Sequence, residues 1–317
     1  MKANHNALKV LAVGAAGPTA SLVVPELLKR NVSVRAFVHK QEDEPIVRQL
    51  GVTDIVAGEL SDASAVAKAL EGMDAVFYIA PAALENEAEV GKQFVAAAKQ
   101  AGVRRVVFSS VIHPVLSELV NHADKAPVEE ALLDSGMEYV FLQPAIFFQN
   151  FVPAWAKMKE TGVYGEPWST ETRFTRVDYR DVAEVAAIAL TEERLLYGTF
   201  ELCAEGNMNR HDLAGLMSEV LGKQVKPIKI ELPAQANMSP KLTRMFDWYD
   251  KHSLLGNSTT LRAILGREPR TLRSFFEELN TGVTNESPFS SFIQGAIPCS
   301  VHRSQNSKWQ GFVATLP

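Results

Sequence analysis

Residues 9–28, KVLAVGAAGPTASLVVPELL, decide the fold. The apolar run Lys9–Val13 predicts a buried strand, and the helical spacing of the apolar residues after it predicts a helix over residues 18–30. Gly14 and Gly17 lie in the turn between the two elements. A strand, a glycine turn and a helix in this order are typical of a pyrophosphate-binding turn, because the helix N-terminus attracts the phosphate charge.

Each small residue of the turn has a physical role in such a site. Gly14 permits the tight turn, Gly17 lets the backbone approach a pyrophosphate, and Ala20 lets the helix pack close to the strand. Many glycine turns are only structural, but the strand and the helix on either side favour nucleotide binding here. The residues that we expect to contact the phosphates are Gly14, Ala16, Gly17, Pro18 and Thr19.

Beyond this turn, short β-branched runs alternate with amphipathic stretches, which is the rhythm of a parallel sheet with crossover helices. We therefore predict an α/β protein with a doubly wound parallel sheet, the Rossmann fold. The predicted strands are Lys9–Val13, Val32–Val38, Asp54–Ala57, Ala75–Ile79, Arg105–Phe108 and Tyr139–Leu142. The predicted helices of this half cover residues 18–30, 42–50, 62–71, 84–101 and 119–135.

After Pro144 the rhythm loosens, and six aromatic residues crowd between Phe147 and Trp168. They would either line a pocket or seal a core, since aromatic side chains dominate both. Further helices are expected at 181–190, 211–221, 240–252 and 271–279, with strands at 199–202 and 225–230. We predict a nucleotide-binding domain over 1–145, a smaller, interleaved C-terminal α/β substrate lobe over 146–280, and a tail of unknown role over 281–317.

The composition excludes several classes of function. The chain of 317 residues has 32 basic and 37 acidic side chains, a net charge of −5, which disfavours direct binding of nucleic acid. Its longest apolar stretch, 139–148, is too short and too interrupted to span a membrane. The two cysteines, Cys203 and Cys299, lie far apart, so we expect no metal centre, no disulfide framework and a cytoplasmic location.

The end of the second strand bears on the choice of dinucleotide. An NAD-specific protein usually has a carboxylate there for the ribose hydroxyls, whereas this chain has His39 and Lys40. Basic groups favour the additional 2′-phosphate, so we predict NADP(H) in preference to NAD(H). The alternative is that Lys40 is merely solvated, and Arg35 is a weaker candidate because its strand can direct it away.

Taken together, the motifs resemble those of the NmrA-like family of atypical short-chain dehydrogenases/reductases. The glycine turn has the G-x-x-G-x-x-A spacing, and the resemblance extends over most of residues 8–280. The other motifs that carry it are GELSD at 58–62, DAVF at 74–77, VVFSS at 106–110, LQP at 142–144, FFQN at 147–150, DYRDVA at 178–183 and LGREP at 265–269.

The resemblance implies a Rossmann sheet that binds NADP(H), with a substrate cleft between the sheet and the C-terminal lobe. On its motifs we expect additional cofactor contacts from Glu59, Leu60, Ala80, Pro81, Ser109, Lys125, Pro144 and Phe147. The family includes reductases that pass hydride to quinones, dyes or phenolic compounds. It also includes regulators that bind the dinucleotide without turnover.

One departure concerns the Tyr-x-x-x-Lys pair of typical short-chain dehydrogenases, whose tyrosine supplies a proton. Four residues before Lys125 stands Asn121. The resemblance implies that Lys125 holds the nicotinamide ribose, although a solvated helix lysine is the alternative. His122 is a candidate proton donor, against the alternative of a buried structural histidine. For the substrate we expect contacts from His113, Asn150 and Tyr164.

Two functions from different classes remain open at this stage. The first is an NADP(H)-dependent reductase that transfers hydride to an electron-poor small molecule, which needs little acid catalysis because the product anion is delocalised. The second is a non-catalytic NADP(H) sensor that changes shape on binding. The first requires a small-molecule substrate, and either allows a homodimer or a regulatory protein partner.

Overall fold

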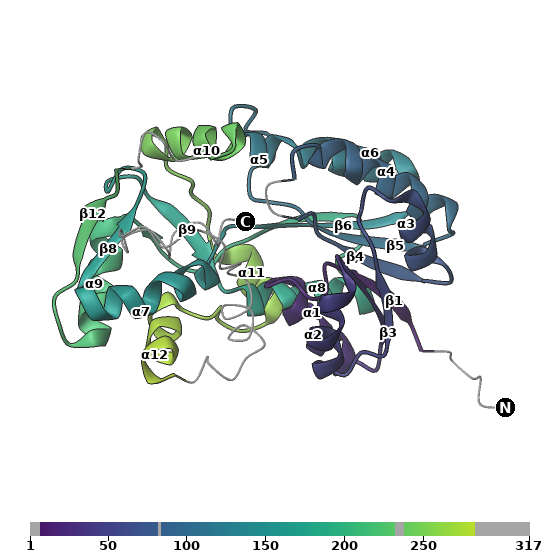
Figure 1. Cartoon of the computed structure of the whole chain (residues 1–317), viewed down its shortest axis with the longest axis horizontal. Coiled ribbons are helices and arrows are strands. Elements are labelled where there is room, and N and C mark those ends of the chain that lie inside the picture. The colour runs from purple at the N-terminus through teal and green to yellow at the C-terminus, as the bar shows by residue number, and fades with distance from the viewer. Residues whose placement is uncertain (1–6, 82–83, 232–237, 283–317) are drawn as a thin grey trace.

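A seven-stranded, entirely parallel sheet forms the centre of the molecule (Figure 1). The computed structural model describes residues 7–81, 84–231 and 238–282. The strand order is β10-β6-β5-β4-β1-β2-β3, which confirms the predicted doubly wound fold. The strands are β1 (Lys9–Val13), β2 (Ser33–Val38), β3 (Asp54–Ala57), β4 (Ala75–Tyr78), β5 (Arg105–Ser109), β6 (Glu138–Pro144) and β10 (Gly198–Leu202).

Helices cover both faces of this sheet, so its strands are apolar on both sides. Along β1, Val10 and Ala12 belong to one core cluster, whereas Leu11 and Val13 belong to the other. Figure 1 shows the two helical layers on opposite faces. One layer contains α1 (Ala20–Leu28), α2 (Glu44–Gln49) and α8 (Tyr179–Thr191), and the other contains α3 (Ala63–Leu70), α4 (Glu87–Gln100) and α6 (Ala126–Ser135).

The structure corrects two predictions about this half. The predicted helix 119–135 is two helices, α5 (Val120–Ala123) and α6, because Pro127 cannot donate the N–H that a continuous helix would require. The strand predicted at 199–202 belongs to the main sheet, where β10 pairs with β6, and not to the C-terminal lobe. Strand pairing between segments far apart in sequence has no local signature.

The C-terminal lobe is built around two small sheets, β11-β9-β7 and β12-β8. Phe148, Phe151 and Trp155 lie in its core, so much of the aromatic cluster seals the lobe. The short elements β7, η2, α7, β8, β9, β11 and α11 were not predicted. The lobe's elements are β7 (Ile146–Phe147), η2 (Phe148–Phe151), α7 (Val152–Thr161), β8 (Val163–Glu166), β9 (Phe174–Val177), β11 (Asn207–Met208), α9 (Arg210–Leu221), β12 (Lys226–Lys229), α10 (Pro240–Lys251), α11 (Thr259–Leu265) and α12 (Leu272–Thr281).

The last helix, α12, extends to Thr281, the first residue of the predicted tail, and the tail beyond Gly282 lies outside the described residues. Among the helices of the described segments, none is long and apolar enough to cross a membrane.

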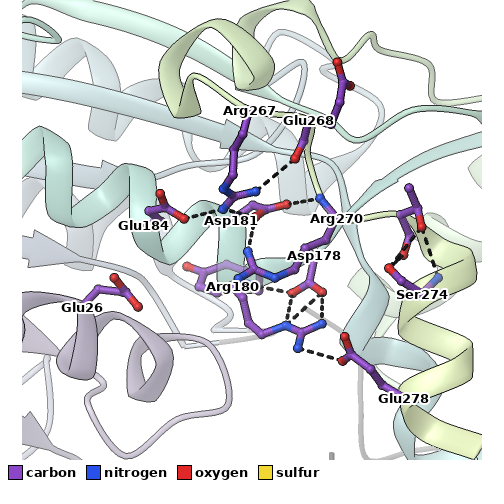
Figure 2. A network of polar contacts seen from close by, with 12 residues as sticks. Glu26, Asp178, Arg180, Asp181, Glu184, Arg267, Glu268, Arg270, Ser274 and Glu278 are labelled. Atoms are coloured by element: carbon purple, nitrogen blue, oxygen red, sulfur yellow. Dashed lines mark hydrogen bonds and ion pairs between the residues drawn. The ribbon is translucent and has the colours of Figure 1, made fainter.

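Two fully buried carboxylates at the start of α8 join the sheet to the C-terminal lobe (Figure 2). Asp181 accepts hydrogen bonds from Arg267 Nη2 at 2.9 Å and from the Arg270 backbone at 2.7 Å, and it also pairs with the Arg270 guanidinium. Asp178 pairs with Arg180 at 2.6 Å, and Arg180 reaches Glu278 of α12 at 2.8 Å. These bonds compensate the cost of burying the two charges and fix the position of α8 against the lobe.

Replacing Asp181 with alanine should destabilise the protein by about 3 kcal/mol, the low end for breaking a buried ion pair, because Arg267 and Arg270 are themselves 38 % and 36 % exposed. Urea unfolding at neutral pH measures this loss. Glu160→Ala is the matched control, since Glu160 is 72 % exposed in its pair with Lys157 and should contribute under about 1 kcal/mol. Equal effects of the two substitutions would contradict the role assigned to Asp181.

Candidate functional site

A cavity of about 700 Å³ lies at the carboxyl ends of the central strands. Val13, His39, Ile79, Ser109 and Pro144 line it, and each stands at or directly after the end of a different strand of the sheet. In an open parallel sheet, the crevice where the strand order reverses is the usual place for a ligand. Here that reversal occurs at β1, which has β2 on one side and β4 on the other.

The glycine turn forms one wall of the cavity. Gly14 has a φ of +66°, and the Gly17 amide donates to its carbonyl oxygen at 2.7 Å. A Cβ atom at Gly17 would lie 3.0 Å from that oxygen, so a side chain there would press on the turn. All five residues predicted to contact phosphates line the cavity: Gly14, Ala16, Gly17, Pro18 and Thr19.

The end of β2 differs from the prediction in part. His39 lines the cavity, but Lys40 is exposed and is not among its lining residues. Asp43, which sequence reasoning missed, lines it instead, because η1 (Gln41–Asp43) turns the chain back toward the site. Arg35 points elsewhere: its guanidinium binds Asp54 at 2.9 Å and the Glu71 carbonyl at 2.8 Å.

Every other residue predicted to bind the cofactor lies at the cavity wall, including Lys125, which is described below. The remaining ones are Glu59, Leu60, Ala80, Pro81, Ser109, Pro144 and Phe147. Ser109 lies within 3.1 Å of the Tyr179 hydroxyl, which links the end of β5 to α8. Whether these residues contact a dinucleotide stays a prediction.

Lys125 lines the cavity and belongs to a cluster of four charges. Its ammonium pairs with Glu87, a carboxylate that is only 3 % exposed. Lys241 of α10 lies 3.5 Å from the same carboxylate and 2.6 Å from Asp124. The cluster therefore holds Lys125 at the cavity and joins α10 to α4 and to the segment between α5 and α6.

His122 also lines the cavity, but its surroundings disfavour the predicted proton donation. Its Nδ1 lies 2.6 Å from the Ile112 carbonyl oxygen, which accepts only if Nδ1 carries the proton. Burial lowers the pKa of His122 to about 4, so the ring is neutral at neutral pH and Nε2 has no proton to give. The alternative of a buried structural histidine fits better, with His122 holding Ile112 at the wall.

The three predicted substrate residues separate in the structure. Asn150 lines the cavity, as expected. His113 does not, because its ring is held between the Leu255 carbonyl at 2.8 Å and Glu201 at 2.9 Å. Tyr164 does not either: it is buried in the core of the lobe, where it packs against Phe151. The structure therefore places neither residue at the cavity.

Sequence reasoning missed Tyr249, which reaches the cavity from α10. Burial raises the pKa of its phenol, and the Asn121 side chain offsets this rise only in part. Asn121 and Tyr249 are 128 positions apart, and the signal sought was a tyrosine on the helix of Lys125. The contact arises because α5 packs against α10.

Two polar atoms of the cavity residues have unused hydrogen-bonding capacity. Ser110 Oγ and Asn121 Oδ1 are buried, and neither has a hydrogen-bond partner among the described residues. Buried polar atoms are normally paired, so these positions suit a polar ligand. In the described segments there is no group of three metal-ligating side chains.

The low pKa of His122 predicts an acid-sensitive protein. The pKa of His122 in the folded protein lies below its ordinary value of 6.5. As the pH falls through 6.5, His122 therefore becomes protonated in the unfolded chain but stays neutral in the folded protein. Stability should therefore fall by about 2 kcal/mol between pH 7.5 and pH 5 from this group. The His122→Asn variant keeps a hydrogen-bond donor for the Ile112 carbonyl but cannot titrate. Its free energy of unfolding, measured with urea, should fall less over the same pH interval, and an equal fall would contradict the low pKa assigned to His122.

The chain is similar in sequence or in fold to several known reductases and to a regulator. It is 25 % identical over 287 residues to the NAD(P)H azoreductase of Xenophilus azovorans, covering 84 % of this chain and 96 % of that protein. The crystal structure of the NADPH-dependent quinone oxidoreductase QOR2 of Escherichia coli, complexed with NADPH, shares the fold with a TM-score of 0.75 at 22 % identity, covering 86 % of this chain and all of that one.

The fold is also that of NmrA, a negative transcriptional regulator solved in complex with NADP, with a TM-score of 0.70 at 16 % identity over 90 % of this chain and all of NmrA. The model of the NmrA-like family matches residues 6–279, which confirms the resemblance drawn from the motifs. The chain therefore belongs to the NmrA-like family.

Proposed function

We propose that this protein is an NADP(H)-dependent oxidoreductase that transfers hydride directly to an electron-poor small molecule of the quinone, dye or phenolic type. One observation carries the proposal: a single cavity joins the glycine turn at the end of β1 to residues of the C-terminal lobe, Asn150 and Tyr249 among them. A cavity that reaches from the phosphate-binding turn to the second lobe is what an acceptor beside a bound nicotinamide requires.

The residues at the wall suit the parts of a dinucleotide. The glycine turn and the N-terminus of α1 favour the pyrophosphate, and Lys125, held by Glu87, is placed for the ribose next to the nicotinamide. The buried oxygens of Ser110 and Asn121 offer hydrogen bonds to polar groups of the ligands. When bound, NADPH supplies the hydride; the protein positions it.

The acceptor must be one that tolerates weak acid catalysis. Asn121 stands where typical short-chain dehydrogenases have their tyrosine, and His122 is neutral with no proton on Nε2. A quinone or a conjugated dye meets this condition, because its reduced form delocalises charge and takes its proton from water. The similarity to an azoreductase supports the same acceptor class.

A second candidate function, an NADP(H)-binding regulator without turnover, is favoured by the absence of that tyrosine and by the fold shared with NmrA. This alternative would need a regulatory protein partner. For either function we propose a cytoplasmic location, since the two cysteines are far apart in the sequence. A homodimer is our proposal for the assembly, and light scattering of the purified protein tests it.

The reductase should oxidise NADPH in the presence of quinones or azo dyes, which the loss of nicotinamide absorbance reports. Lys125→Met should weaken NADPH binding by about tenfold, the loss of one charge-assisted hydrogen bond. Calorimetric titration measures that affinity, and Lys157→Met is a control at an exposed helix position. Tight NADPH binding without turnover of any acceptor would reject the reductase and favour the regulator.

The cofactor preference depends on charges at the end of β2. His39 at the wall favours a 2′-phosphate, whereas the Asp43 carboxylate at the same wall repels it. Asp43→Asn should therefore raise the affinity for NADPH several-fold and leave that for NADH nearly unchanged. Parallel titrations with the two cofactors measure this, and an equal change for both would show that Asp43 does not face the 2′-position.

A further inference from the structure

The cavity has a phenol that the proposed function has not yet used. Tyr249 of α10 and Asn121 of α5 both line the cavity, and their helices pack against each other. Figure 1 shows α10 lying beside α5. Lys125, which the proposed function assigns to the nicotinamide ribose, lines the same cavity as this phenol.

The C-terminal lobe holds the Tyr249 ring, and the nucleotide-binding half holds α10, the helix that carries it. Within the C-terminal lobe its ring packs edge-on against Trp168 at 5.3 Å and Phe174 at 5.1 Å between centroids. At the other end of α10, Lys241 donates to Asp124 at 2.6 Å and to the Leu84 carbonyl at 3.0 Å. A side chain fixed in this way loses little entropy when it binds a ligand, which is what a preorganised hydrogen-bond donor requires.

The phenol keeps its proton. Burial raises the pKa of Tyr249, and the neighbouring Asn121 amide offsets this only in part. In typical short-chain dehydrogenases the tyrosine instead has a lowered pKa and gives up its proton. A phenol that stays protonated donates a hydrogen bond to a developing negative charge but does not act as an acid.

We propose that Tyr249 donates a hydrogen bond to the carbonyl oxygen of a quinone-type acceptor and stabilises the negative charge that forms there during hydride transfer. This inference rests on the proposed function and names the acceptor chemistry of the same cavity. The hydride brings both electrons from NADPH, which becomes NADP⁺, and the quinone becomes the hydroquinone anion. A proton from water completes the hydroquinone, while Tyr249 retains its own.

The proposal distinguishes two kinds of acceptor. A quinone develops charge on oxygen, so its transition state gains from the Tyr249 donor. A cationic triphenylmethane dye accepts hydride at its central carbon and becomes neutral, so no oxyanion forms. Tyr249 should therefore assist the first reaction and have no part in the second.

The test is Tyr249→Phe, which removes one oxygen and keeps the packed ring. With NADPH, the kcat for a benzoquinone should fall by about 100-fold, the lower end of the loss caused by removing one oxyanion donor. The rate with a triphenylmethane dye should stay within about twofold. Tyr197→Phe is the matched control, because Tyr197 is 60 % exposed and does not line the cavity; it should change neither rate.

A second measurement needs no turnover. The 4-nitrophenolate ion has the charged oxygen that the proposal assigns to Tyr249, and its absorption band shifts when a donor binds it. With NADP⁺ present, the Tyr249→Phe variant should bind 4-nitrophenolate about tenfold more weakly than the unmodified protein does. The absorption band of the bound ion should then no longer shift. The Tyr197→Phe variant should bind it as the unmodified protein does.

The outcomes separate the two proposals. An unchanged quinone rate in Tyr249→Phe, or an equal fall with the quinone and the dye, would overturn the role of Tyr249. Failure of the unmodified protein to reduce any acceptor would overturn the proposed function instead. In that case the 4-nitrophenolate titration still decides whether Tyr249 is an oxyanion donor, and equal binding by both variants would reject it.

Discussion

The parallel pairing of β1 with β2 on one side and with β4 on the other is the constraint on which the rest of the structure depends. Parallel strands need crossover connections: here the chain passes from β1 through α1 to β2 on one side, and later returns from β3 through α3 to β4 on the other side of β1. The chain therefore opens a crevice above the carboxyl end of β1. The glycine turn must lie there, with Gly14 at positive φ and Gly17 too close to its carbonyl to accept a side chain without strain.

Charges hold the second lobe over this crevice at two places. Asp178 and Asp181 join α8 to the segments around α12, and the cluster of Glu87 and Lys125 with Lys241 and Asp124 joins α10 to the nucleotide-binding half. Buried charges contribute little net stability, because desolvation opposes their attraction. Their value here is geometric: each cluster fixes a residue of the cavity. Gln149, which lines it, donates to Asp178 at 2.8 Å, and Lys125 is held by Glu87.

The sequence predicted well those features that depend only on residues close together in the chain. The strands of the first half follow from apolar runs, and the glycine turn follows from its spacing between strand and helix. Local pattern also failed in identifiable ways. His113 and Tyr164 were assigned to substrate from their chain position, but a hydrogen bond to Leu255 holds the first and the lobe's core buries the second. Asp43 reaches the cavity through a short η1 turn.

Tyr249 marks the limit of such reasoning, because its place depends on a contact between helices 120 residues apart. The break at Asp124 and Lys125 matters for this contact. In one continuous helix, residues four apart share a face, so a tyrosine at position 121 would stand beside Lys125. Here a new helix begins with Pro127 in its first turn, and α5 lies against α10, so that Asn121 and Tyr249 line the same cavity. The segment before Lys125 therefore has no tyrosine, and the packing of α10 against α5 brings a phenol from a different helix to the same cavity.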